Sequence, residues 1–317
     1  MGCHMLLLRY HSIWFGTPKA ASGCIESGKA RGWHSGGRHW ISCLADPTVR
    51  VLNPAFLDTQ LHHDHMPRSY RPDHRGPVFN FFWPLTSYLV THVTVLLGAI
   101  LFYVLNRTTV IGRSNVPRCR NTLLISNHQS LIDSFFVGFT AYFGPSFVKP
   151  YLIPWNPAGE EFFYRNPWQS WWSDQWKCIP VRRRRRDLGA LNRMLHALKS
   201  GTMILFPEGT RTRTGSIEEG RPGAGVVILK DRPTVIPVTI DGLNEILPVN
   251  TRWPKLFKRV YIVFGKPIDY SAFVTEVASR EASQQIVDHV MGVLRLQMDW
   301  IQDLKAGRTD RNNPPWV

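Results

Sequence analysis

A histidine and an aspartate five positions apart form the first pair of side chains in this chain suited to acid–base chemistry. His128 follows a short apolar run in the segment 127–133 (NHQSLID), which ends on Asp133. On one regular helix the two side chains would lie about 140° apart, so they meet only if His128 precedes the helix. Asp133 would then accept a hydrogen bond from one ring nitrogen and leave the other as a base. The alternative is a surface histidine beside a helix-capping aspartate.

The segment 206–211 (FPEGTR) supplies groups that suit an anion. Gly209 permits a tight backbone path close to a ligand, Thr210 can donate a hydroxyl hydrogen bond, and Arg211 presents a planar fork that matches phosphate. Glu208 either orients Arg211 or helps to position a substrate. A base beside a cationic site predicts acyl transfer to the hydroxyl of a phosphorylated alcohol.

Five consecutive arginines, 182–186, follow the apolar residues 178–181. Such runs are usually solvated faces or patches that bind lipid headgroups or nucleic acid. Because this run follows a predicted strand, we expect one arginine to point into the site while the others meet anionic headgroups. Each charge near an anionic bilayer contributes roughly 1 kcal/mol of attraction.

An alternating α/β pattern must position these groups. We expect strands at 121–126, 146–153, 177–181, 202–206, 235–240 and 260–264, and helices at 131–143, 187–200 and 278–305. His128 would then lie on a loop at the edge of a sheet, where side chains reach substrate. The predicted fold class is α/β: a mixed sheet flanked by helices and preceded by an N-terminal membrane-associated helix.

That N-terminal helix is predicted from residues 81–105, which contain no Lys, Arg, Asp or Glu. These 25 residues are long enough for a hydrocarbon core of about 30 Å. Trp83, Tyr88 and Tyr103 stand near its ends, as interfacial anchors do. The alternatives are a buried core helix, or a helix that lies in the interface after a break at Pro84. His92 would need a polar partner in hydrocarbon.

The charge balance favours an anionic partner, since 38 Lys and Arg stand against 23 Asp and Glu, a net charge of +15. Membrane lipids fit this balance. Nucleic acid is the weaker interpretation, because no recognised binding module accompanies the charge and the apolar segment would go unexplained. Five scattered cysteines indicate a reducing compartment without a disulfide framework.

Residues 1–65 differ in composition from the rest and hold seven of the twelve histidines. Residues 62–65 (HHDH) lack a second cluster at ligand spacing, so no metal site is expected. We interpret 1–65 as a disordered extension, and Met66 is a candidate for the true start. Residues 78–106 would be the membrane-associated or transmembrane segment, 107–306 the catalytic domain and 307–317 a tail.

The order of four blocks (NHQSLID, then IPVRR, FPEGTR and VIPV) resembles the glycerolipid acyltransferases, the group that contains lysophosphatidic acid acyltransferase. The resemblance covers about 110–270. It implies that His128 is the base with Asp133 as its partner, and that Arg183, Glu208, Gly209 and Arg211 bind the acceptor phosphate, with Thr210 in the same turn. Lys177 and Arg182 depart from the family pattern, which leaves open whether Arg182 or Arg183 is the phosphate ligand.

The sequence therefore predicts a membrane-bound O-acyltransferase with its catalytic domain on the cytoplasmic side, because the basic segments follow the apolar stretch. It would move an acyl group from acyl-CoA or acyl carrier protein to a lysophospholipid, most simply 1-acylglycerol-3-phosphate giving phosphatidic acid. The thioester is a co-substrate, and no cofactor or metal is expected. The alternatives are an acyltransferase for another lysophospholipid, a hydrolase of the same lipids, or a non-enzymatic basic membrane-binding protein.

Overall fold

The computed structural model describes residues 71–183, 187–251, 253–274, 279–312 and 314. The predictions for residues 1–65 and for the start at Met66 fall outside these ranges, as do residues 184–186 of the arginine run. The described residues belong to one compact unit, Pro67–Val317.

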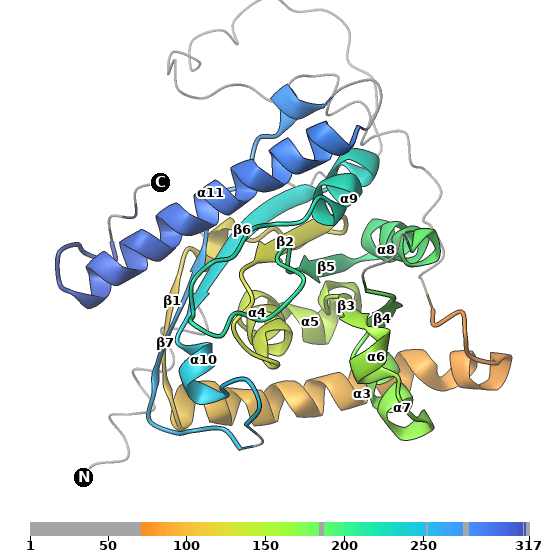
Figure 1. The fold of residues 1–317 in the computed structure, drawn as a ribbon. Coiled ribbons are helices and arrows are strands. Elements are labelled where there is room, and N and C mark those ends of the chain that lie inside the picture. The colour runs from red at the N-terminus through yellow and green to blue at the C-terminus, as the bar shows by residue number, and fades with distance from the viewer. Residues whose placement is uncertain (1–70, 184–186, 252, 275–278, 313, 315–317) are drawn as a thin grey trace, which may run out of the picture. The chain divides into compact units, whose positions relative to one another are not determined.

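A five-stranded mixed sheet forms the centre of this unit (Figure 1). Its strands are β1 (Arg107–Ile111), β2 (Thr122–Ser126), β5 (Thr202–Leu205), β6 (Thr234–Asp241) and β7 (Arg259–Phe264), in the spatial order β1-β7-β6-β2-β5. Neighbouring strands are parallel except β6 and β7, which are antiparallel. A smaller parallel pair, β3 (Asn156–Gly159) and β4 (Cys178–Val181), lies next to β5. The predicted α/β class with a mixed sheet is confirmed.

Helices cover both faces of the sheet. They are α3 (Pro77–Ala99), α4 (Asp133–Tyr142), α5 (Pro145–Val148), α6 (Glu160–Phe163), α7 (Pro167–Gln175), α8 (Leu188–Ser200), α9 (Gly223–Asp231), α10 (Leu243–Ile246) and α11 (Arg280–Lys305), with a π-helical turn at Ile100–Val104 and 3-10 turns at Arg113–Asn115, Pro150–Leu152 and Ser271–Phe273. On one face of the sheet, α11 packs against β6 and against α9. On the other face, α4 packs against β5 and against α3 (Figure 1).

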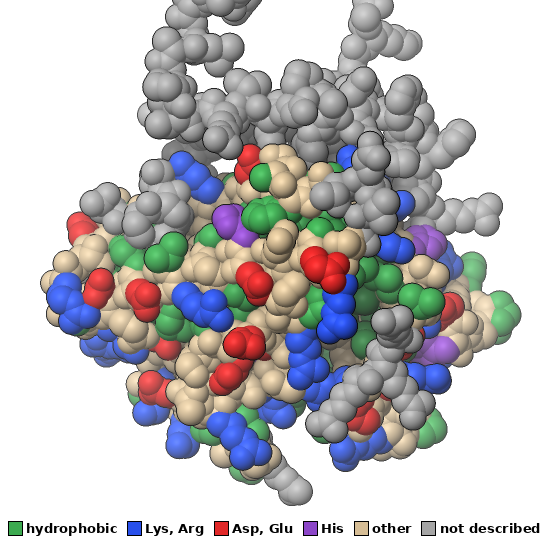
Figure 2. Space-filling view, turned by 45° about the horizontal axis from the view of Figure 1, so that its top comes forward, with side chains coloured by type: hydrophobic (Ala, Val, Ile, Leu, Met, Phe, Trp, Pro, Cys, Tyr) green, Lys and Arg blue, Asp and Glu red, His purple; other side chains and the backbone are tan. Residues whose placement is uncertain are grey.

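Helix α11 shows the amphipathic pattern that its sequence predicts. Ile286, Val290, Leu294 and Ile301 are buried against the sheet, because residues three and four positions apart share a helix face. Across the face shown in Figure 2, which brings the α11 side forward, acidic and basic side chains are interspersed. This side of the domain is therefore suited to exposure to solvent.

Most of the other predicted elements are found within one or two residues of their expected ends, but the strand predicted at 146–153 is wrong. The chain there forms α5 and a 3-10 turn. Gly144 has a φ of +86° and turns the backbone, and Pro145 and Pro150 each begin a helical turn, where a missing N–H costs nothing. The apolar residues here are spaced as in a strand, but the proline and glycine residues favour helical turns instead.

Helix α3 and the π-helical turn after it cover the predicted membrane segment, and together they form a 28-residue helix that is long and apolar enough to cross a membrane. One side packs on the domain: the Trp83 indole donates to the Asp174 carbonyl, and Ser87 and Thr91 donate to the Gln175 carbonyl. The other side exposes apolar residues to the surroundings, namely Val78, Phe81, Phe82, Leu85, Leu89, Val93, Leu96, Leu97, Ile100 and Val104.

The proline in α3 does not break the helix. Pro84 lacks the N–H that would bond to the carbonyl of Asn80, and the Arg71 guanidinium donates to that carbonyl at 2.7 Å instead. The break at Pro84, which was part of one alternative interpretation of this segment, is therefore not found. His92 has the polar partners it needs, since Nδ1 bonds to the Tyr88 carbonyl and Nε2 lies 3.4 Å from the Ser146 hydroxyl.

Candidate active site

His128 lies on the loop between β2 and α4, and its neighbours fix that loop. The buried Asn127 amide bonds to both the N–H and the carbonyl of Ile240 in β6. The Gln129 side chain accepts from the Leu243 N–H and donates to the Gly215 carbonyl. Since the amides on either side of His128 are buried and satisfied, the histidine is carried on a rigid part of the sheet edge.

His128 and Asp133 are in direct contact, at 2.8 Å between Nδ1 and Oδ2. Asp133 begins α4 and is fully buried, and the same oxygen accepts from the N–H groups of Gln129 and Ser130. A carboxylate at this position makes Nδ1 the protonated nitrogen, so Nε2 is left as the acceptor. The His128 side chain is 22% exposed, which is enough for Nε2 to meet a substrate.

The turn after β5 holds His128 from the other side. The Phe206 ring stacks on the imidazole with ring centroids 4.2 Å apart. Glu208 Oε1 accepts from the His128 N–H at 3.0 Å, and the Thr212 N–H donates to the His128 carbonyl at 2.8 Å. Glu208 thus contacts the histidine backbone, a contact that the sequence alone does not predict, and the residue is only 2% exposed. Burial raises its pKa to about 7.

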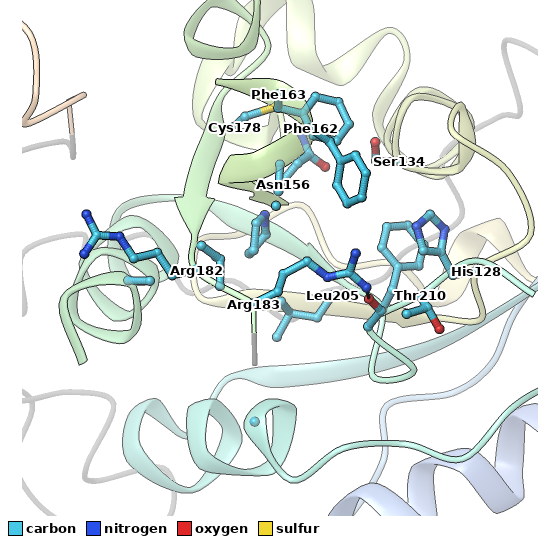
Figure 3. Close-up of a pocket in the computed structure, with 18 of the residues that line it drawn as sticks. His128, Ser134, Asn156, Phe162, Phe163, Cys178, Arg182, Arg183, Leu205 and Thr210 are labelled. Carbon is cyan, nitrogen blue, oxygen red and sulfur yellow. Dashed lines mark hydrogen bonds between the residues drawn. The ribbon is translucent and has the colours of Figure 1, made fainter. Parts of the chain in front are cut away.

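His128 opens onto a cavity of about 1610 Å³ (Figure 3). One part of its wall is aromatic and aliphatic, formed by Phe162, Phe163, Trp168, Trp172, Leu191 and Met194. Another part is cationic, formed by Arg182, Arg183, Arg211, Arg213, Arg221 and Arg280. A cavity with these two kinds of wall suits a molecule that has both a hydrocarbon chain and an anionic group.

Figure 3 distinguishes the two described arginines of the run. The Arg183 side chain points toward His128 and Thr210, whereas Arg182 points to the opposite side. Arg183 donates to the Gly209 carbonyl, lies over the Phe162 ring and has its guanidinium 3.5 Å from Glu161, while Arg182 pairs with Glu160 at 3.0 Å. Of the two, Arg183 is therefore the one directed toward the histidine.

Gly209, Thr210 and Arg211 line the same cavity. Gly209 has a φ of +67°, the left-handed region that glycine adopts without strain, so the turn between Glu208 and Thr210 depends on it. The predicted site residues are thus together, except that Asp133 and Glu208 are buried behind His128 and do not line the cavity.

Arg221 is a cavity residue that sequence reasoning missed. Its N–H donates to the Pro207 carbonyl, and its side chain passes about 3.5 Å from where a β-carbon on Gly209 would be. In the described part of the chain, no acid forms an ion pair with Arg221 or Arg211. The sequence signal is only a basic residue in the Gly/Pro-rich stretch 220–223, which does not reveal a contact with a turn twelve residues earlier.

Comparison with known proteins identifies the domain that carries this site. Residues 107–241 match a family model described as Acyltransferase. They run from β1 to the end of β6 and include His128, Asp133, Arg183 and the FPEGTR turn. Residues 107–241 belong to the acyltransferase family. The resemblance to glycerolipid acyltransferases that the sequence blocks indicated is thereby confirmed.

Individual relatives agree with this family. The chain is 26% identical over 200 residues to the chloroplastic 1-acyl-sn-glycerol-3-phosphate acyltransferase of Arabidopsis thaliana, and the match covers 62% of this chain and 52% of the relative. The chain is 30% identical over 159 residues to N-acylphosphatidylethanolamine synthase of the same plant, which covers 47% of this chain and 56% of the relative. The chain thus spans about half the length of these relatives.

A crystal structure of the 1-acyl-sn-glycerophosphate acyltransferase of Thermotoga maritima is also similar. It is 24% identical, with a TM-score of 0.46, and the match covers 69% of this chain and 97% of that one.

Proposed function

We propose that this protein transfers a fatty acyl group from a thioester to the free hydroxyl of a lysophospholipid, with 1-acylglycerol-3-phosphate as the simplest acceptor and phosphatidic acid as the product. The main observation behind this proposal is the His128–Asp133 contact, which leaves Nε2 free in the same cavity into which the Arg183 side chain points. A base next to a cation suits an acceptor whose hydroxyl and phosphate are on one small molecule.

In this mechanism His128 Nε2 takes the proton of the acceptor hydroxyl, and the oxygen attacks the thioester carbonyl directly. The C–S bond then breaks, the thiolate leaving group takes the proton back from Nε2, and an ester and a free thiol result. Asp133 balances the charge on the imidazolium. The N–H groups of Gln129 and Ser130 are already bonded to Asp133, so an oxyanion donor would have to follow Ser130, where Leu131 lines the cavity.

The acceptor phosphate would bind between Arg183, Arg211 and Arg221, near Gly209 and Thr210. Arg211 and Arg221 form no ion pair with an acid among the described residues, and Arg183 lies 3.5 Å from the exposed Glu161. Such guanidinium groups are suited to bind phosphate in a bidentate manner. Glu208 is assigned a positioning role instead, because its carboxylate accepts from the His128 backbone. The acyl chain of the donor would lie along the aromatic wall, with coenzyme A or acyl carrier protein as its carrier. No cofactor or metal is part of this proposal.

We place the enzyme at a membrane surface through the outward side of α3. Its polar side chains pack on α7 along several turns, from Trp83 to Thr94, whose hydroxyl accepts from the Trp176 indole. A perpendicular, spanning orientation of α3 would draw those parts of the domain into hydrocarbon. An orientation in the interface, with one apolar side in the lipid, avoids that cost, and we assign the domain to the cytoplasmic side.

Acyl transfer by the purified full chain tests the proposal. With an acyl-CoA and lysophosphatidic acid in mixed micelles, wild type should release thiol and form phosphatidic acid in equal amounts. His128→Ala should keep its melting temperature and lose turnover. Fatty acid release without acceptor would favour a hydrolase. Retention of transfer by the variant would remove the general-base role.

A second acceptor class is favoured by the number of cations. Arg213 and Arg280 also line the cavity, which is more positive charge than a single phosphate monoester requires. A lysophospholipid that carries more than one phosphate, such as a lysocardiolipin, would use this excess. A panel that contains lysophosphatidic acid, lysocardiolipin and, as less charged controls, lysophosphatidylglycerol and lysophosphatidylethanolamine distinguishes these acceptors by their values of kcat/KM.

A further inference from the structure

The segment Trp253–Phe257, between α10 and β7, exposes large apolar side chains outside the cavity. Trp253 is 84% exposed, Phe257 82% and Leu256 39%. Single exposed apolar residues are ordinary on soluble proteins, but a contiguous group of them marks an interaction surface. Trp and Phe are also the side chains that lie well at the boundary between lipid headgroups and hydrocarbon.

Backbone hydrogen bonds fix this segment to the end of the apolar helix. The Phe257 N–H donates to the Leu105 carbonyl at 2.9 Å, and the Lys258 N–H donates to Asn106 Oδ1 at 2.8 Å. Leu105 and Asn106 directly follow the π-helical turn in which Val104 is exposed. In Figure 1 the chain between α10 and β7 passes around this end of α3. The exposed aromatics therefore belong to a segment that lies next to the C-terminal end of the apolar helix.

Phe257 holds an unusual backbone conformation. Its φ is +61°, a region that bulky side chains rarely adopt and that costs free energy. The conformation persists because the hydrogen bond to Leu105 and the strand pairing that begins at Arg259 fix both sides of the residue. The strained turn leaves the ring in solvent, although a bulky apolar ring would ordinarily be buried.

Basic residues alternate with these aromatics. Lys255 and Arg259 are exposed, and no acid among the described residues forms an ion pair with either. Lys258 lies 3.7 Å from Glu245. Exposed cations beside interfacial aromatics are the combination that binds anionic lipid headgroups, and they would be unfavourable in a dry contact between proteins.

We propose that Trp253–Phe257 is a second membrane-binding element, whose Trp and Phe side chains enter an anionic lipid surface next to α3 while Lys255 and Arg259 meet the headgroups. This inference rests on the proposed membrane placement of α3. Two contacts, one along α3 and one beyond its C-terminal end, would fix the rotation of the domain on the bilayer, which a single helix cannot do.

Vesicle binding by the full chain tests the element directly. The double variant Trp253→Ser, Phe257→Ser should bind phosphatidylcholine–phosphatidylglycerol vesicles at least about 10-fold more weakly than wild type, because two large apolar side chains lose their burial. The matched control is Leu296→Ser on the outer side of α11, where the leucine is 65% exposed. Its binding should equal that of wild type. Equal binding by the double variant and wild type would overturn the proposal.

A conservative variant, Trp253→Phe, controls for misfolding. Brominated lipids should quench part of the tryptophan fluorescence of wild type, and Trp253→Phe should lose that part while it binds vesicles nearly as well. If quenching is the same in both proteins, Trp253 does not enter lipid and the proposal fails. Lys255→Gln with Arg259→Gln should remove the preference for anionic over pure phosphatidylcholine vesicles, and an unchanged preference would count equally against it.

The activity and the solution state distinguish this inference from its alternatives. The double variant should keep the wild-type rate on lysophosphatidic acid in detergent micelles. The proposed reaction is tested separately by His128→Ala, so failure of the membrane element and failure of the reaction give different results. If the double substitution leaves vesicle binding intact but converts a dimer to a monomer in sedimentation velocity, the segment is an interface between copies of the chain, and the membrane assignment is wrong.

Discussion

Glu208 accepts a hydrogen bond from the backbone N–H of His128 at 3.0 Å. The carboxylate comes from the turn after β5 and the histidine from the loop after β2, and these two strands are parallel neighbours in the sheet. Because parallel strands end at one edge of a sheet, residues 80 positions apart are in contact there. The contact gives Glu208 a structural role as a hydrogen-bond acceptor at a position that does not line the cavity.

Glu208 makes folding stability dependent on pH. Its pKa is raised from 4.5 to about 7 by burial, so between these values the folded state binds more protons than the unfolded state. The stability that the fold gains by holding Glu208 in its protonated form is fully present below pH 4.5 and is lost as the pH rises through about 7. Glu208→Gln should flatten that part of the profile while it retains an oxygen acceptor for the His128 N–H. Melting temperatures of both proteins across this range measure the difference, and identical profiles would contradict it.

Asp133→Asn should lower kcat by about 10²-fold or more, because an amide can donate to Nδ1 and so favours the wrong imidazole tautomer. The effect on KM for the acceptor should be small, since Asp133 does not line the cavity. Asp299→Asn, on the exposed side of α11, is the control. Steady-state kinetics in micelles give the result; a variant that keeps its full kcat would remove Asp133 from the mechanism.

Arg183 and Arg182 offer a matched pair of neighbours. Arg183→Ala should raise the KM for a phosphate-bearing acceptor about 10-fold or more, and Arg182→Ala should change it little, because only Arg183 points toward His128. Arg183→Lys should recover part of the loss, since an ammonium restores the charge without the fork. Acceptor titrations at saturating donor measure these values. The reverse order of effects would assign the ligand to Arg182.

Arg221→Ala should also raise the acceptor KM while it leaves the KM for the donor unchanged. Its guanidinium arm lies against Gly209 and carries no ion pair within the described residues, so the fold should lose little stability. Lys230→Ala, an exposed cation on α9, is the comparison. A rise in the donor KM alone would place Arg221 at the thioester carrier.

The two sides of α3 predict opposite effects. Trp83 is 4% exposed and stacks on Trp155 with ring centroids 5.5 Å apart, so Trp83→Ala should lower the free energy of unfolding by about 3–5 kcal/mol. Phe81→Ala removes a side chain that is exposed on the outer side of the helix and should leave stability nearly unchanged while it weakens vesicle binding. Denaturant unfolding and vesicle sedimentation separate the two; the same effect in both variants would mean that α3 has no lipid-facing side.

The sequence predicts the centre of the sheet better than its edge. The runs at 122–126 and 202–205 are short, apolar and fully or nearly buried, so hydrophobicity alone identifies them as buried strands. Strand β1 was missed because its sequence, RTTVI, is only partly buried and takes its position from pairing with β7. That pairing joins residues about 150 positions apart, which no local pattern reveals.

The same limit applies to the candidate site. His128, Asp133 and the FPEGTR turn were recognisable because local spacing and block order mark them. Arg221, and the aromatic wall that includes Trp172, reach the cavity only through the packing of α7 and of the loop before α9. Glu208 was identified by its motif, but its contact with the His128 backbone depends on the register of β2 against β5.

The turn after β5 binds the histidine backbone at two points, through Glu208 and Thr212, and it also carries Arg211 to the cavity. General base and anion ligand therefore move as one rigid body, so a substitution that reshapes this turn for a new headgroup would misplace the base as well. Divergence in acceptor preference is thus easier through Arg183 and Arg221, which reach the cavity from separate elements. Relatives with different headgroups should vary at those positions and retain the turn.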